Sequence, residues 1–148
     1  MTALSDPQMN VWCDGSKYLE DEIRAEVRCL IGRIYPGGEF IDRRAERRYP
    51  YPYLVRLIPL DDDGKVLHNE AIVAVGKHLS DRGIGFYHPQ PLPHRQMIVS
   101  LEASDGSAST FVVNLGWCRF TRQGWYESGG KFLDVLASVP ESYAKQSA

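Results

Sequence analysis

Short runs of strand-forming residues, each bounded by a turn signal, fill most of the chain after Gly38, and this pattern limits the fold more than any other feature. The expected strands are Tyr53–Leu60, Glu70–Ser80, Gly83–His88, Met97–Ala103, Thr110–Thr121 and Trp125–Val135. The connections between them are rich in Asp, Gly and Pro, as in DDDGK, where Gly64 is expected to take a positive φ. Frequent short strands with such turns predict a small antiparallel barrel or sandwich.

A single helix is expected ahead of these strands, at about residues 16–34. Apolar residues recur there at steps of three and four, which is typical of one buried helical face. They are Leu19, Ile23, Val27, Leu30, Ile31 and Ile34. Ser16 can cap the start, and the sequence YPGG ends the helix. The chain therefore divides into an N-terminal extension (1–39), a barrel domain (40–140) and a polar tail expected to fray (141–148).

Composition restricts the classes of function. With 148 residues, 43% hydrophobic and 24% charged, the chain can bury a core of its own. A formal net charge of -2 argues against a broad nucleic-acid-binding or anionic-membrane-binding surface. Three widely spaced cysteines form no CxxC pair and are expected to act as small apolar residues in a reducing cytoplasm. No secretory leader or membrane span is predicted.

The run RRAERR concentrates positive charge, since four of its six residues are arginines. Arg44 and Arg48 are four residues apart, as are Arg43 and Arg47, so each pair lies on one side of a helix or a strand. Arginine can fork onto phosphate oxygens or the edge of guanine, and its flat face can stack on a base. Taken alone, the run is better interpreted as a solvated charged segment, because Asp42 and Glu46 partly neutralise it.

A second motif, HLSDRGIGF, joins two apolar strands. Ser80 offers a hydroxyl, and Gly83 and Gly85 would allow the backbone to approach a ligand and its N–H groups to bind an anion. By itself this motif is better interpreted as a strand connection whose glycines serve the turn, because a lone G-x-G is a weak signal.

Taken together, RRAERRYPYPYLVRL and HLSDRGIGF resemble the bacterial PilZ domain family, in which an R-x-x-x-R arm precedes the first strand and a D/N-x-S-x-x-G turn follows. Arg44 and Arg48 match the arm, and Ser80 and Gly83 match the turn. The segment GWCRFTRQGWYESGGKFLDV resembles the last hairpin of the family. The resemblance covers roughly residues 40–136.

The resemblance implies a six-stranded barrel that binds cyclic di-GMP, a bacterial second messenger with two guanines and two phosphates. The ligand-binding residues would be Arg44, Arg48, His78, Ser80 and Gly83, with support from Arg43 and Arg47. His78 departs from the family, which has Asp or Asn at this position; imidazole cannot accept two hydrogen bonds as a carboxylate does. We expect weakened binding, and an arm of like charges that is mobile until ligand screens it.

Other features predict structural roles. The histidines show no metal spacing and are expected in loops or on the surface, Trp117 and Trp125 in the barrel core, and Tyr49, Tyr51 and Tyr53 in the core and at its rim. No catalytic constellation is visible, and no cofactor or metal is expected.

Three hypotheses remain open from the sequence. The first is a cytoplasmic cyclic di-GMP receptor. The second is a PilZ-like interaction module that has lost the nucleotide and binds an unknown protein partner. The third, disfavoured by the net charge, is a barrel that binds single-stranded nucleic acid. A homodimer stays open in each.

Overall fold

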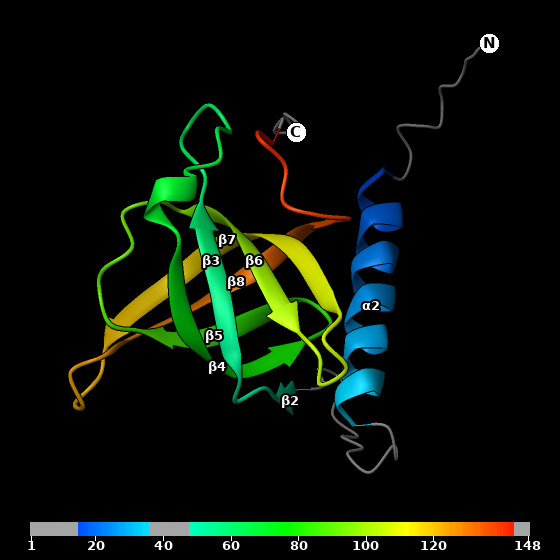
Figure 1. Cartoon of the computed structure of the whole chain (residues 1–148), viewed down its shortest axis with the longest axis horizontal. Coiled ribbons are helices and arrows are strands. Elements are labelled where there is room, and N and C mark those ends of the chain that lie inside the picture. Colours follow the sequence, from blue (N-terminus) through cyan, green and yellow to red (C-terminus); the bar gives the residue numbers. More distant parts are fainter. Residues whose placement is uncertain (1–14, 36–47, 144–148) are drawn as a thin grey trace.

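The computed structural model describes residues 15–35 and 48–143 (Figure 1). Within these ranges one helix precedes a set of strands. The elements are α2 (Gly15–Ile34), β2 (Arg48–Pro50), β3 (Leu54–Pro59), the short 3-10 helix η1 (His68–Glu70), β4 (Ile72–Ser80), β5 (Gly83–His88), β6 (Gln96–Glu102), β7 (Ala108–Phe120) and β8 (Tyr126–Leu136).

Six of the strands form a closed antiparallel barrel. Their order is β4-β3-β6-β7-β8-β5, and β5 pairs again with β4 to close the ring. The additional strand β2 extends β4 on the side toward α2 (Figure 1). Closure removes the exposed edges that an open sheet would carry. The prediction of a small antiparallel six-stranded barrel with a preceding helix is confirmed, and each expected strand is present with its ends shifted by only a few residues.

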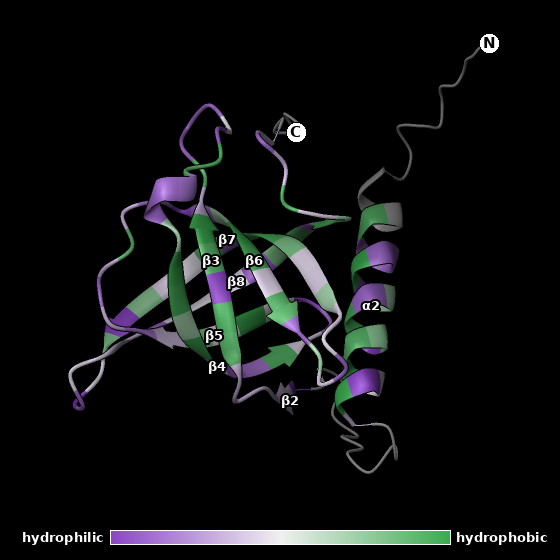
Figure 2. Ribbon diagram, in the orientation of Figure 1, coloured by the Kyte–Doolittle hydropathy of each residue, from purple (hydrophilic) through white to green (hydrophobic). Residues whose placement is uncertain are grey.

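Inward-facing residues of the strands fill the barrel, and the helix closes part of its surface. Val27 and Leu30 of α2 are fully buried, as are Leu57, Phe86 and Phe111 of the strands. Apolar residues of the helix face the barrel, where it packs mainly against β8 (Figure 2). Full burial of each such side chain contributes about 1.5–3 kcal/mol, so the helix is an integral part of the packed structure.

The two tryptophans of the last hairpin are not in the core, which corrects the sequence prediction. Trp117 is 46% exposed and Trp125 is 39% exposed. Leu115 faces the interior, but the pairing of β7 with β8 shifts between Leu115 and Trp117. A β-bulge of this kind adds one residue and reverses the face on which the following side chains lie. Trp125 lies in the turn just before β8.

His88 is buried, although the sequence predicts a loop or surface position. Its Nδ1 lies 2.6 Å from the carbonyl oxygen of Gln90, and its Nε2 lies 2.7 Å from Ser128 Oγ. Because a carbonyl only accepts, Nδ1 carries the proton and Nε2 accepts from the serine hydroxyl. This neutral tautomer satisfies both nitrogens, which explains how a histidine is accommodated inside.

The first residues of the polar tail pack against the barrel, where fraying was expected. Ser142 forms a bridge with Lys65, and the backbone N–H of Tyr143 donates to the carbonyl of Gly64 at 2.7 Å. The hydroxyl of Tyr143 donates to Asp134 Oδ2 at 3.0 Å. Gly64 has the expected positive φ, 87°. Residues 144–148 lie outside the described part of the chain.

Of the cysteines, Cys29 and Cys118 are free thiols on the surface.

Candidate functional site

A hollow of about 380 Å³ on the outer face of the barrel brings together the described residues of the predicted ligand site, Arg48, His78, Ser80 and Gly83. Its lining comes from β2, β4, β5, β7 and β8. The residues are Arg48, His78, Ser80, Arg82, Gly83, Ile84, Asn114, Gly116, Trp117, Gly129, Gly130 and Lys131. The predicted site residues Arg43, Arg44 and Arg47 lie outside the described residues.

Pairing of β2 with the end of β4 places the arginine motif next to the serine turn. Arg48 lies opposite Ser80, and Pro50 lies opposite His78. Tyr49 between them is buried, so Arg48 and Pro50 face outward. Pro50 and Pro52 favour extended backbone in the residues before them, which suits a short strand at this position. The alternation of the strand therefore aims Arg48 toward the hollow.

Ser80 organises the turn between β4 and β5. Its side-chain oxygen accepts hydrogen bonds from the backbone N–H groups of Arg82 (3.2 Å) and Gly83 (3.3 Å). These two N–H groups, which the sequence suggested for anion binding, thus already have a partner. The serine hydroxyl keeps its own proton to donate. A Cβ at Gly83 would collide with the carbonyl oxygen of Gly130, so this glycine allows two strands to approach closely.

Two glycines that face each other on β5 and β8 form the floor beneath two rings. Gly85 pairs with Gly129. A Cβ at Gly85 would lie 3.0 Å from the ring atom Cε1 of His78, and a Cβ at Gly129 would lie 2.5 Å from Nε1 of Trp117. The imidazole and the indole therefore lie directly over the backbone of adjacent strands. Bulges in β4 and β7 turn both side chains onto this outer face.

Trp117 is a candidate site residue that sequence reasoning missed. The hydrophobic pattern of β7 favoured a core position, and only the shift in pairing shows that the indole is exposed. The two adjacent glycines in the sequence ESGGK were the available signal, because glycines in a strand often mark close approach of another group. An exposed indole can stack on a nucleobase, which contributes about 1–3 kcal/mol per base in proteins that use this interaction.

The charge of the hollow is positive. Arg48, Arg82 and Lys131 line it, and no Asp or Glu is among its lining residues. Asp81 belongs to the same turn but forms salt bridges with the helix, at 3.5 Å to Arg24 and 3.9 Å to Arg28. The arrangement can bind a flat, anionic molecule, with aromatic faces for a base and cations for phosphate.

Helix α2 contacts both halves of this site. Besides the salt bridges to Asp81, the hydroxyl of Tyr35 just after the helix donates to the carbonyl of Pro50 in β2 at 2.8 Å. The helix thus holds the serine turn at one point and the strand of Arg48 at another.

Two other features are absent from the described ranges. No group of three or more His, Cys, Asp or Glu side chains in residues 15–35 and 48–143 is arranged to hold a metal ion. In the same part of the chain, no helix has the length and apolar character to cross a membrane.

Comparisons with known proteins identify similar structures but no close relative. No family model matches the chain, and no curated protein matches it. Among solved structures, the chain is similar to the inhibitor of motility MotI/DgrA of Bacillus subtilis, at 10% identity and a TM-score of 0.46, covering 66% of this chain and 46% of that one. It is also similar to the structure of a K. pneumonia MrkH–c-di-GMP complex, at 18% identity and a TM-score of 0.36, covering 62% of this chain and 45% of that one.

The matched region therefore spans less than half the length of either solved structure.

Proposed function

We propose that this protein is a cyclic di-GMP receptor module, in which the arginine arm changes conformation when the ligand binds. The observation that carries the proposal is the meeting of Arg48, His78, Ser80 and Gly83 in one hollow with an exposed indole. The sequence resemblance selects these residues by their order in the chain, whereas the hollow brings them together in space.

The chemistry of the hollow suits this ligand. Cyclic di-GMP carries two phosphate charges and two guanine rings. Arg48, Arg82 and Lys131 supply positive charge, and Trp117 supplies a face on which a guanine can stack. The hydroxyl of Ser80 can donate to a phosphate or guanine oxygen. Arg44, with Arg43 and Arg47, would complete the clamp from the arm, and the binding energy would shift the arm toward its bound conformation.

A second candidate function is a PilZ-like interaction module that does not bind the nucleotide. His78 favours it, because its imidazole lies over Gly85 on the floor of the hollow, where the family has Asp or Asn. Loss of one polar contact costs about 1–3 kcal/mol, or roughly one to two decades of affinity. This size of loss weakens binding without requiring its disappearance, so the receptor function is the stronger proposal.

Isothermal titration calorimetry of the full chain with cyclic di-GMP, with GTP as the control ligand, tests the proposal. We expect binding heat with cyclic di-GMP, and its loss in Arg44→Ala and in Arg48→Ala. Arg56→Ala is a matched control, since Arg56 is exposed on β3 outside the hollow and its loss should leave the heat unchanged. No heat from the intact chain at tens of micromolar ligand would contradict the receptor function.

The change His78→Asp separates the two candidates. A modest gain in an affinity that is already measurable supports the receptor. Binding that exists only in His78→Asp supports the interaction module.

A further inference from the structure

The outer face of the barrel on the other side of the β4 bulge carries exposed apolar side chains. Leu54, Val75 and Tyr87 lie side by side in register on β3, β4 and β5. Leu54 is 66% exposed, and Val73, the other outward valine of β4, is 57% exposed. Strand β4 places its small residues, Ala74 and Gly76, inside the barrel and its valines outside. Single exposed apolar side chains are common on protein surfaces, but a contiguous group of them often marks an interaction surface.

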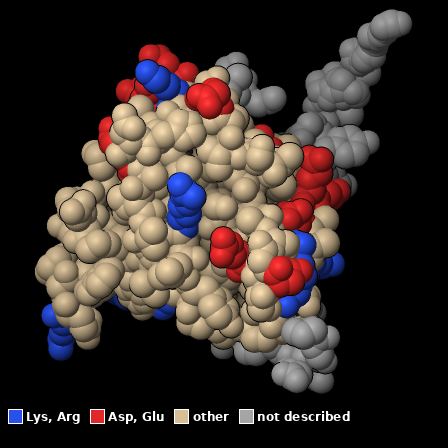
Figure 3. All heavy atoms as spheres, in the orientation of Figure 1, with Lys and Arg blue, Asp and Glu red and all other residues tan. Residues whose placement is uncertain are grey.

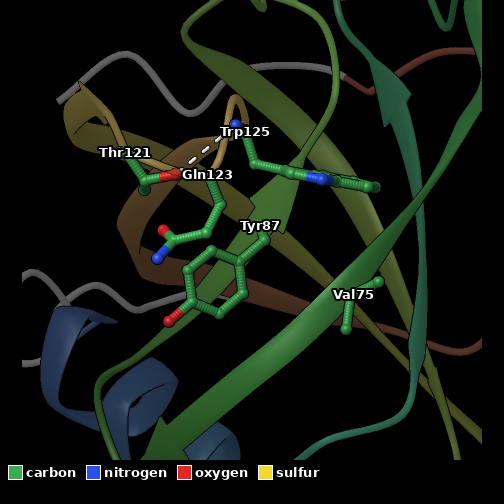
Figure 4. A pocket seen from close by; sticks show the side chains of 5 residues that line it. All are labelled: Val75, Tyr87, Thr121, Gln123 and Trp125. Atoms are coloured by element: carbon green, nitrogen blue, oxygen red, sulfur yellow. Dashed lines mark hydrogen bonds between the residues drawn. The ribbon is translucent and has the colours of Figure 1, made fainter.

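An apolar notch of about 420 Å³ lies at the end of this row. Figure 4 shows Trp125 and Val75 on one side of it, with Tyr87 and Gln123 on the other. Two hydrogen bonds stabilise the turn that carries Trp125. The backbone N–H of Thr121 donates to the carbonyl of Trp125 at 2.7 Å, and the backbone N–H of Trp125 donates to Thr121 Oγ1 at 3.4 Å. The notch is therefore an open recess with a hydrogen-bonded turn on one side, and its volume is sufficient for a large apolar side chain.

A second, charged hollow adjoins the notch. The two share Tyr87, Thr121 and Gln123 as lining residues, and the second adds Arg119, Arg122 and Glu127. Glu127 is neutralised twice, by Lys77 at 2.7 Å and by Arg119 at 2.8 Å. No carboxylate of the described residues lies within salt-bridge distance of Arg122. Lys77 and Arg119 place two positive charges around the single carboxylate of Glu127, and Arg122 adds a third positive charge. This hollow is therefore positive, although the chain as a whole is slightly acidic.

We propose that the notch and the charged hollow form one groove that binds a segment of a partner protein, with a large apolar side chain in the notch followed closely by acidic residues. The charge of the groove selects acidic neighbours, and the recess selects the apolar anchor. A recess can enclose a single side chain of a peptide, which favours a peptide over a flat lipid surface as the occupant. Few lysine, arginine, aspartate or glutamate side chains lie on the face of the barrel that Figure 3 shows.

Peptide display on the full-length chain tests this inference without reference to the nucleotide. A phage-displayed library of random peptides is selected on the immobilised protein, and enriched peptides are synthesised and measured by fluorescence anisotropy. We expect enriched sequences to combine an aromatic residue or Leu with Asp or Glu beside it. Val75→Glu should weaken the binding of these peptides about tenfold or more. Arg122→Glu should weaken their binding and make it less sensitive to salt.

Lys65→Glu is the matched control, since it makes the same change of charge as Arg122→Glu. Lys65 lies after β3, where it forms a bridge with Ser142, and it lines neither hollow, so binding should be unchanged. Circular dichroism shows that each variant is folded, and Leu54→Ser serves as a second test of the apolar row. The inference is overturned if no peptide is enriched, or if enriched peptides bind Val75→Glu equally well.

Two further results would also overturn it. One is Val75-dependent binding to vesicles of phosphatidylcholine and phosphatidylserine without peptide binding. The other is a Val75-dependent dimer in sedimentation.

Discussion

The indole of Trp117 on β7 lies directly over the backbone of Gly129 on β8, so close that a Cβ at this glycine would be 2.5 Å from the indole Nε1. The two residues are also register partners in the barrel. The indole can occupy this position only because Gly129 has no side chain beneath it. This relationship makes the position of the proposed stacking surface depend on a residue that itself offers no functional group.

Gly129→Ala is therefore expected to displace the indole and to weaken cyclic di-GMP binding. Crowding a packed contact costs about 1–3 kcal/mol of stability, so thermal unfolding should also shift downward. Calorimetry and the tryptophan emission of the variant measure the two effects. Gly32→Ala on α2 is the control outside the hollow, because an added Cβ there has no atom within 4 Å, and it should neither weaken binding nor lower thermal stability. Equal affinity in Gly129→Ala and the natural chain would rule out a stacking role for Trp117.

Asp81→Asn tests the role of the negative charge that Asp81 places beside the hollow and that α2 partly neutralises. Asp81 pairs with Arg24 and Arg28, whose side chains are partly exposed, so the salt bridges contribute at most about 1 kcal/mol to stability. The substitution also removes a negative charge beside the hollow, and we expect tighter binding of an anionic ligand at low salt, with the gain shrinking as salt rises. Titrations of both proteins at two salt concentrations measure this. A large loss of stability would instead show that Asp81 has a structural role.

The buried His88 is expected to make the free energy of unfolding depend on pH. Burial lowers the pKa of this histidine below its usual value of 6.5, although its bond to the Gln90 carbonyl opposes the shift. The unfolded chain therefore binds more protons than the folded one below about pH 6.5, and the free energy of unfolding should decrease as pH falls from there toward the folded pKa. Urea unfolding at neutral and mildly acidic pH measures the decrease.

The comparison variant for this prediction is His88→Gln, which cannot titrate. Its free energy of unfolding should be lower at neutral pH, because the Ser128 and Gln90 contacts are altered, but it should vary less across the same pH range. If the natural chain and His88→Gln show the same dependence on pH, another group is responsible.

Much of the fold follows from local sequence. Alternating apolar residues and Gly/Asp turns located every barrel strand, and the three- and four-residue steps located α2, because these patterns report which face of an element is buried. Arg48, Ser80 and Gly83 were selected by the resemblance of their motifs to the PilZ domain family. Local patterns could not show that the glycine pair of β8 lies under Trp117, since the contact depends on the register of two strands.

The sequence by itself determined the order and type of the elements and the residues on which a ligand site could be built. The tertiary structure decided which surface each side chain occupies. Bulges in β4 and β7 moved His78 and Trp117 onto the outer face, and closure of the barrel placed β4 and β7 on either side of the paired glycines. A bulge inserts a single residue and reverses the side-chain alternation that follows, so its position is fixed by packing between strands and not by the residues of one strand alone.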